Sequence, residues 1–544
     1  MDASPVALRA RRKKCDETKP SCLRCEAAGK VCEGYRNAIA PSPSALESKR
    51  QLARSLPYGL AHTRCSWYGL VALTEEVTQN EFGVDAAMWA GLISKVYRIS
   101  PAVHTAVSCL GATYERLSSS RLVDQVLLDS SIKELYAMSL RKLQEEIEEE
   151  TNGLPLFFAS VILATVEVLQ DNPINALTHT QGAFRLYGAM IPASDFSLAA
   201  SKTDLLQSEE QHALTSIVRS LDIQTASYAL ARPLDLPPFS VVQNIPTNGS
   251  TPPSTERMRS QILSLLHNCY HFAIQASKHR YVHCSHIPPD ITVDQGRHIS
   301  LLLSWLSVLK DCEKQGSSSA DVRLDARQRC ILSLRAQCLS SLVYLSAILC
   351  PHETSYDAFL DLFDEIVQIA FLMLYRDGTL AKGRSRPRFR LLSSLSQPLF
   401  LTAMKCRDPQ VRRKAVELLA LTGREGPWDA EILVPVVAAA IALEEGSGRQ
   451  GRQVTASDLE GEDTRDLMDL SILVPPRLRL HGCGLGAISV HKANSTQQDV
   501  KRTIDVRFSR CVNVEDMVTS TEGNNSRAFE DERHWDIWHQ TVEL

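Results

Sequence analysis

Apolar residues recur every three to four positions along most of the chain, which is the period of amphipathic α-helices. One clear segment runs from Phe158 to Leu169 and ends at Asn172-Pro173, because proline rarely continues a helix. The same spacing predicts further helices at 86–97, 101–117, 127–148, 174–189, 208–231, 256–278, 297–312, 326–349, 356–376, 389–405 and 409–421. About a dozen consecutive helices, without alternating strands between them, predict a mostly α fold of packed antiparallel hairpins.

Two polar stretches divide this pattern into parts. Residues 36–64 contain Ala40-Pro41-Ser42-Pro43-Ser44 and little periodic hydrophobicity, so they are predicted to be a linker. Residues 446–470 are polar and charged, and we expect a disordered acidic linker there. Beyond them, Gly486–Val490 and Thr503–Arg510 predict a short hairpin, the minor β structure near the C-terminus. The predicted order is a small head at 1–35, a linker at 36–64, an all-α domain at 65–445, a linker at 446–470 and a C-terminal extension at 471–544.

The bulk composition is that of an ordinary globular protein, with 544 residues of which 44% are hydrophobic and 22% charged. No apolar run approaches the roughly 20 residues that span a bilayer. The N-terminal residues lack the apolar core of a secretory signal. We therefore expect a soluble intracellular protein without a membrane partner.

Charge is distributed unevenly along the chain. Residues 1–36 hold nine Lys/Arg against five Asp/Glu, a local net charge of +4, whereas the whole chain has a net charge of −4. The remaining residues therefore carry −8. A small basic head on a large acidic body suggests a tip that binds a polyanion.

Four of the 15 cysteines stand close together in the basic head. Cys15, Cys22, Cys25 and Cys32 follow the spacing Cys-x6-Cys-x2-Cys-x6-Cys. Thiolates are soft ligands that tetrahedral zinc prefers, and short spacers bring them to one ion at low entropic cost. The other eleven cysteines are scattered, mostly within apolar segments, and we interpret them as buried thiols.

A run of basic residues stands directly before the first of these cysteines. Five of six consecutive positions are Lys or Arg, which would place them on a short helix whose end is fixed by metal. Such a helix presents charge to phosphates and long hydrogen-bond donors to base edges. The basic residues are Arg9, Arg11, Arg12, Lys13 and Lys14.

This cysteine-rich segment resembles the Zn2Cys6 module of fungal transcription regulators. The family pattern is Cys-x2-Cys-x6-Cys, a loop with proline, and a second Cys-x2-Cys-x6-Cys, with Arg-x-Arg-Arg-x-Lys-Cys-Asp in the first half. The matching residues here are Arg9, Arg11, Arg12, Lys14, Cys15 and Asp16, followed by Cys22, Cys25 and Cys32. In the family, two Zn2+ ions share bridging thiolates and the basic helix enters the major groove. The resemblance implies nuclear DNA binding at short GC-containing sites such as CGG triplets, often as a dimer.

By position, the resemblance also assigns roles to the basic residues. Arg11 and Arg12 match the pair that contacts bases, and Arg9, Lys13 and Lys14 match phosphate or supporting contacts.

The segment departs from the family pattern at its beginning. The first two cysteines are expected at positions 5 and 8, where this sequence has Pro5 and Leu8. Three explanations stay open: an incorrect start or splice junction in the gene model, a regulator that has lost DNA binding, and a rearranged site in which four thiolates hold one zinc. The second explanation defines the alternative function, an interaction protein that acts through its helical body.

The helical body resembles the regulatory, middle-homology region of the same regulators over roughly residues 65–445. The resemblance implies an all-α domain that represses, dimerises or binds a small-molecule effector between helices. The motifs that carry it are Asp85-x3-Trp89 with Ser100-Pro101-Ala102-Val103 and Leu110-Gly111-Ala112, then Glu167-x5-Pro173-x2-Ala176-x2-His179, then Arg424-Glu425-Gly426-Pro427-Trp428-Asp429.

Several polar groups in the body invite a chemical interpretation. We expect Glu167 and His179 to be a buried polar pair rather than catalytic groups. The residues from His279 to His286 are interpreted as a helix end or loop rather than a metal site. We expect Glu145–Glu150 to be a solvated helix face, and Asp458–Asp469 to be either a plain linker or a short activation segment.

No nucleotide-binding, phosphate-loop, serine-nucleophile or zinc-protease signature occurs in the sequence. We therefore do not expect an enzyme. The remaining alternative is a helical enzyme with a polar pocket. A pocket that holds two or more titratable groups with shifted pKa values would favour it.

Overall fold

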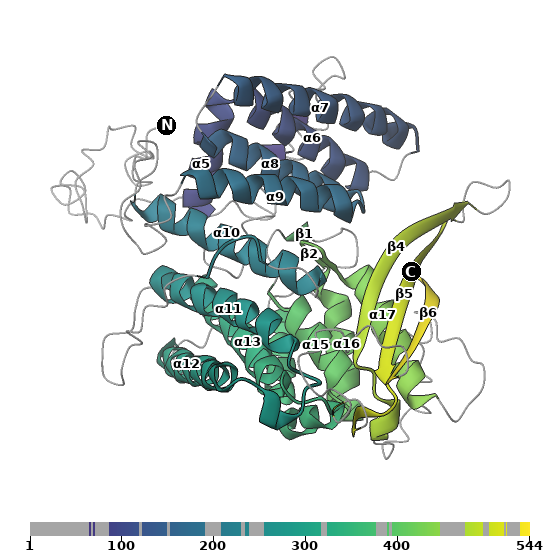
Figure 1. Cartoon of the computed structure of the whole chain (residues 1–544). Helices are drawn as coiled ribbons and strands as arrows, with labels where there is room; N and C mark the ends of the chain where they lie inside the picture. The colour runs from purple at the N-terminus through teal and green to yellow at the C-terminus, as the bar shows by residue number, and fades with distance from the viewer. Residues whose placement is uncertain are drawn as a thin grey trace, which may run out of the picture. The chain divides into compact units, whose positions relative to one another are not determined.

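The structure is a computed structural model, and its description covers the helical body and most of the C-terminal extension. The described residues are 65–66, 69–70, 86–118, 122–149, 153–190, 208–229, 234–238, 255–316, 324–376, 389–390, 394–446, 474–492, 500–515, 518 and 534–544. They are mostly α-helical with a few strands, the longest near the C-terminus, which confirms the predicted fold class (Figure 1). The chain divides into two compact units, Met1–Arg64 and Cys65–Leu544, and all described residues lie in the second.

The first helices form one hydrophobic core around α8. Nearly every residue of α8 is buried, and this helix packs against α9, α6, α5 and α7. Its apolar run is therefore explained by burial on several sides rather than by one amphipathic face. The bounds are α5 Ala86–Ile99, α6 Pro101–Ser118, α7 Leu122–Glu148, α8 Gly153–Leu169 and α9 Pro173–Met190.

The later helices surround a second, larger core. The contacts of α13 with α11, α12 and α14 organise it, and buried side chains such as Trp305, Leu339 and Val436 fill it. The bounds are α10 Ser208–Ala229, α11 Thr255–Ser277, α12 Pro289–Gly316, α13 Ala326–Ala347, α14 Leu360–Arg376, α15 Ser396–Lys405, α16 Pro409–Thr422 and α17 Ala430–Glu445. Three short 3-10 helices are η4 Cys284–His286, η5 Glu353–Phe359 and η9 Pro476–Leu478.

Among the described helices, α13 alone is long and apolar enough to cross a bilayer, over Arg327–Ala347. The sequence prediction that no run approaches this length is therefore wrong for this segment. Most of the window is buried inside the protein. The core accounts for its apolar composition, because α13 is covered by neighbouring helices on several sides.

The C-terminal strands form an antiparallel sheet in the order β4-β5-β6. The predicted hairpin is confirmed as β4 (Gly482–Lys492) paired with β5 (Val500–Cys511), whereas β6 (Trp535–Glu543) was not predicted. Side chains at alternate positions of β5, namely Ile504, Val506 and Phe508, are buried in the core of α11–α17. The extension therefore shares a hydrophobic core with the helices.

Some predicted helix boundaries differ from the structure. α12 begins at Pro289 rather than at 297. Proline is well tolerated in the first turn of a helix, because backbone N–H groups there make no hydrogen bond within the helix. The start of the predicted helix 356–376 is the 3-10 helix η5. A two-residue strand, β1 (Phe389–Arg390), replaces the start of the predicted helix 389–405.

β1 belongs to a small sheet inside the helical region. It pairs in parallel with β2 (Arg424–Glu425), which pairs antiparallel with β3 (Trp428–Asp429). The turn that produces β2 and β3 uses Gly423 and Gly426, whose φ angles are 74° and 55°. Glycine adopts this left-handed region without steric cost.

Glu146 does not lie on a solvated helix face as predicted. Its carboxylate accepts hydrogen bonds from the Ser100 hydroxyl and from the backbone N–H of Ala102 at 2.8 Å. These groups stand at the start of α6, where backbone N–H groups lack helical partners. Glu146 is thus a buried cap supplied by α7 to α6.

Candidate zinc and DNA-binding site

The predicted zinc and DNA contacts all lie outside the described residues, in the unit Met1–Arg64. They are the ligands Cys15, Cys22, Cys25 and Cys32 and the basic residues Arg9, Arg11, Arg12, Lys13 and Lys14. The chemistry and spacing of these residues are what point to a zinc and DNA-binding site. Four thiolates form a complete tetrahedral ligand set for one zinc ion, whereas two ions sharing bridging thiolates use six.

The described part of the body holds no group of three or more His, Cys, Asp or Glu side chains that could bind a metal ion. The segment from His279 to His286 follows the end of α11 and contains the short helix η4, as predicted. His283 caps η4, with its Nδ1 atom 2.7 Å from the Ser285 hydroxyl. This segment is a capped turn.

Eight of the eleven described cysteines are buried, and none forms a disulfide. Burial raises the pKa of Cys109 and Cys338 to about 12 and that of Cys406 to about 11. These thiols stay protonated at neutral pH, so they are neither nucleophiles nor ready zinc ligands. The prediction of buried thiols is confirmed for the eight buried cysteines and is wrong for Cys284, which is exposed because it lies in the turn after α11.

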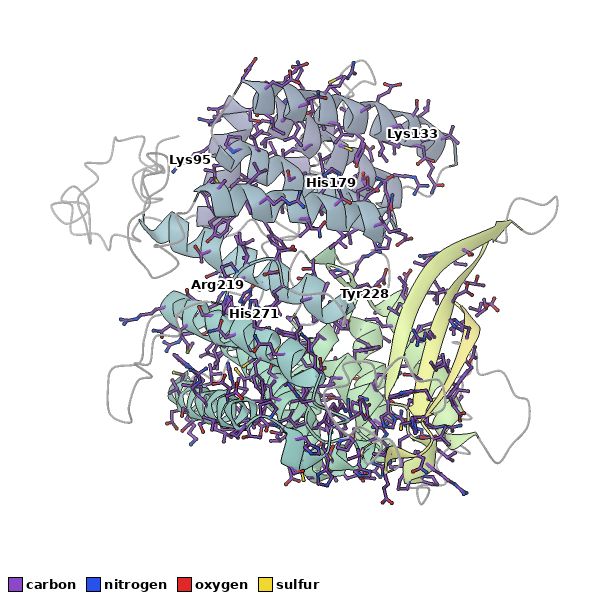
Figure 2. All side chains as sticks on the ribbon, in the orientation of Figure 1. Lys95, Lys133, His179, Arg219, Tyr228 and His271 are labelled. Atoms are coloured by element: carbon purple, nitrogen blue, oxygen red, sulfur yellow. The ribbon has the colours of Figure 1, made fainter. Side chains whose placement is uncertain are left out.

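Glu167 and His179 belong to one polar cluster between α7, α8 and α9. The Tyr136 hydroxyl lies 2.7 Å from His179 Nε2, and Asn175 donates to Glu167 at 3.3 Å. Burial lowers the pKa of His179 (labelled in Figure 2), so its imidazole is neutral at pH 7. The geometry is that of a satisfied polar contact within packed helices.

A second polar cluster joins α10 to α11. The buried carboxylate of Asp222 lies 2.9 Å from His267 Nε2 and accepts from the backbone N–H of Leu236 at 3.1 Å. Arg219 and His271 lie on the same two helices (Figure 2), and burial lowers the pKa of Arg219 to about 10. These contacts bind the segment after α10 to the helix pair.

A small cavity lies between α10, α11, α13 and α15. Its volume is about 30 Å³, and its polar lining includes Ser220, Gln224, Gln337 and Gln397. A space of this size accepts one or two water molecules. In this conformation the cavity does not hold a metabolite-sized effector.

Glu353, at the start of η5, lies at the centre of a buried ion cluster. Its carboxylate accepts from Arg280 Nη2 at 2.8 Å and from Lys405 Nζ at 2.9 Å. Burial by itself raises the pKa of Glu353, but Lys405, Arg280 and Arg407 together lower it to about 2. The ionised carboxylate compensates for the burial of these cations.

Glu444, near the end of α17, extends this cluster. It accepts from Arg407 Nη2 at 2.7 Å and from the backbone N–H of Leu480 at 2.6 Å, and it lies 2.7 Å from Arg412 Nη1. Arg407 Nη2 also lies 3.5 Å from Glu353. The two carboxylates thus connect the start of α16, the end of α17 and the chain that leads into β4.

The same cluster holds the backbone of residues 474–481. Lys405 Nζ donates to the carbonyl of His481 at 2.9 Å, and Arg479 Nε donates to the carbonyl of Val474 at 3.1 Å. Burial lowers the pKa of His481 to about 4, so its imidazole is neutral. No local sequence pattern marks this cluster, because its members are far apart in the chain.

Comparison with known families gives one match. Residues 9–41 match the fungal Zn(2)-Cys(6) binuclear cluster domain. This range contains all four predicted zinc ligands and all five predicted DNA contacts. The match points to a DNA-binding transcription regulator of the zinc-cluster type, and it covers the head only. No curated protein and no solved structure matched the chain.

Proposed function

We propose that this protein is a zinc-dependent, sequence-specific transcription regulator of RNA polymerase II genes that acts in the nucleus. The observation that carries the proposal is the match of residues 9–41 to the zinc-cluster domain, with five basic residues directly before the first cysteine. The family match gives no support to the alternative that DNA binding has been lost.

The proposed roles of the head residues follow from their chemistry. Cys15, Cys22, Cys25 and Cys32 hold zinc, which fixes the end of the basic helix. Arg11 and Arg12 donate to base edges of a short GC-containing site such as a CGG triplet, since arginine pairs with guanine in the major groove. The remaining basic residues, Arg9, Lys13 and Lys14, neutralise phosphates, which makes binding depend strongly on salt.

The described body supports the proposal as a scaffold. Its polar clusters make hydrogen bonds and ion pairs that hold packed helices together, and burial raises the pKa of its core thiols. We propose that residues 65–445 act as the regulatory domain, with 1–35 as the DNA-binding head, 36–64 and 446–470 as linkers and 471–544 as an extension. Formation of a homodimer and control by a small-molecule effector are part of this proposal.

Native mass spectrometry of the full chain tests the role of the cysteines directly. We expect bound zinc that is lost from a variant with Cys22→Ser and Cys25→Ser, and that is kept when the buried thiols Cys330 and Cys338 are changed to alanine. One ion identifies the four-thiolate site. A chain that takes up no zinc at all overturns the proposed mechanism.

A further inference from the structure

Two exposed aromatic side chains on α14 form a stacked pair. Phe371 and Tyr375 are 43% and 41% exposed, and their ring centroids lie 4.1 Å apart. They are the two aromatic residues among the strongly exposed large hydrophobic side chains of the described part. Exposed aromatic area of this kind is costly in water, and it commonly marks an interaction site.

A cation completes this surface. Lys414 of α16 places its Nζ atom 5.7 Å from the centre of the Phe371 ring and 6.0 Å from that of Tyr375. Lys414 also lies 2.7 Å from Glu417, whose side chain is 63% exposed. We call Phe371, Tyr375 and Lys414 the aromatic–lysine face. Its chemistry favours a partner that carries both carboxylates and apolar side chains.

The chain itself contains a segment of this chemistry. Asp458–Leu470 holds six Asp/Glu and one Arg, a net charge of −5, together with Leu459, Leu467, Met468 and Leu470. In contrast, residues 376–390, which continue directly from α14, hold six Lys/Arg and one Asp. The acidic segment and the stretch that follows α14 in the sequence therefore have opposite charge.

The described chain stops and resumes on either side of the acidic segment at points that are attached to α16 and η5. Before the acidic segment, Glu445 at the end of α17 accepts from Arg413 at 2.6 Å, and Arg413 is the neighbour of Lys414 on α16. After the segment, Arg479 binds Asp357 of η5 at 2.7 Å, immediately before α14 begins. One end is thus attached to α16, which carries Lys414, and the other to η5, which leads directly into α14.

The length of the chain also permits the contact. Phe371 lies eleven residues beyond the start of α14, a distance of about 16 Å along the helix. Leu467 is seven residues from Val474, and a chain of that length spans up to about 24 Å. This reach exceeds the length of α14 between its start and Phe371, so the length of the chain does not prevent the contact.

We infer that the aromatic–lysine face is an intramolecular docking surface for the acidic segment Asp458–Leu470. Leucine and methionine side chains cover Phe371 and Tyr375, and carboxylates face Lys414 and the adjacent basic chain. Docking holds this acidic segment on the body and limits its access to other proteins. The inference does not depend on zinc or DNA binding by the head.

Hydrogen–deuterium exchange of the full-length protein tests this contact. We expect amides of residues 458–470 to exchange about ten-fold more slowly in the wild type than in a variant with Phe371→Ser and Tyr375→Ser. A second variant, Leu467→Ser with Met468→Ser, releases the same segment while the body is unchanged, which separates undocking from misfolding. Combining the two sets of substitutions gives no further increase in the exchange rate of residues 458–470, because both sets remove the same contact.

A matched control changes two exposed apolar residues elsewhere. Val293 and Leu303 of α12 are 68% and 52% exposed, and their replacement by serine leaves the exchange of 458–470 unchanged. The inference is overturned if the wild-type segment exchanges as fast as the Leu467→Ser, Met468→Ser variant. It is also overturned if protection depends on protein concentration, since the occupant of the face would then be a second copy of the chain.

Discussion

The carboxylate of Asp171 binds the guanidinium group of Arg424 across 253 residues of sequence, with 2.6 Å between Oδ1 and Nη2. Its second oxygen accepts from Arg502 of β5 at 2.7 Å. Asp171 also has a φ angle of 58°, a conformation that side-chain-bearing residues rarely adopt. This residue thus joins the end of α8 to strand β2 and to the C-terminal sheet.

The ion pairs of Asp171 with Arg424 and Arg502 are predicted to stabilise the fold. Asp171→Gly keeps the left-handed backbone accessible but removes both ion pairs, and we expect it to lower the free energy of unfolding by about 1 kcal/mol, since the groups are partly exposed. Asp129→Ala removes an ion pair to Arg116 whose two side chains are 43% and 40% exposed, and serves as the control with a smaller loss. Urea denaturation measures both. Equal stability of Asp171→Gly and the wild type would show that these ion pairs contribute nothing.

The buried ion cluster predicts unequal effects of removing an anion and a cation. Glu353→Gln leaves Arg280, Lys405 and Arg407 without their shared carboxylate, and we expect a loss of about 3–5 kcal/mol. Lys405→Met leaves Glu353 with two cations, so its loss is less than half as large. Thermal or urea unfolding compares the two variants. A larger loss for Lys405→Met would contradict the described charge balance.

Acid is predicted to destabilise the folded protein through the contacts that hold residues 474–481. The pKa of His481 falls from 6.5 to about 4 on folding, so between these values the unfolded chain binds a proton that the folded chain does not. Stability therefore falls as the pH drops below 6.5, by about 1–2 kcal/mol at pH 5 from this residue. Glu353, with a pKa of about 2 in the folded protein, adds a further loss below its ordinary value of 4.5.

Urea midpoints of the wild type and His481→Gln at pH 7 and pH 5 isolate this contribution. Burial also lowers the pKa of His179, His267, His271 and His298, so the wild type loses stability from several groups. The difference between the two proteins belongs to His481. We expect His481→Gln to lose less stability than the wild type between pH 7 and pH 5. An identical loss in both proteins would show that His481 does not contribute.

Two helical glycines are predicted to respond in opposite ways to alanine. A Cβ atom at Gly111 of α6 would lie 1.8 Å from the carbonyl oxygen of Cys65, so Gly111→Ala must displace the segment that begins at Cys65. A Cβ atom at Gly182 of α9 would meet nothing within 4 Å. We expect Gly111→Ala to be destabilising and Gly182→Ala to be neutral or stabilising, by up to about 1 kcal/mol. Thermal unfolding that shows Gly111→Ala as stable as the wild type would contradict this packing.

Local patterns explain which parts of the fold the sequence predicts. Helices with periodic apolar residues and the hairpin of Gly486–Val490 with Thr503–Arg510 are predicted, because each pattern is complete within one segment. β6 is not, since the residues that pair with the buried Val506 and Phe508 of β5 are Gln540 and Trp538, so one face of the strand mixes polar and apolar side chains. Glu146 was assigned to solvent because its partner, the start of α6, lies 44 residues away.

The candidate zinc and DNA-binding site and the buried ion cluster differ in whether a local pattern predicts them. Four cysteines and five basic residues within 24 positions form a local pattern, so the sequence predicts zinc and DNA contacts without a fold. The ion cluster around Glu353 and Glu444 depends on the tertiary arrangement, and only the structure brings Lys405, Arg407 and Arg479 to it.

Sequence-specific DNA binding by the head is the central claim, and fluorescence anisotropy with the full-length chain measures it directly. We expect zinc-dependent binding to a duplex with CGG triplets that weakens with rising salt. Arg11→Ala with Arg12→Ala weakens binding at least about thirty-fold, since each arginine pair with guanine contributes about 1–3 kcal/mol. The control, Lys133→Ala with Arg141→Ala on the exposed side of α7, leaves binding unchanged. Equal affinity for CGG and scrambled duplexes, or affinity that zinc chelation does not alter, would contradict the account.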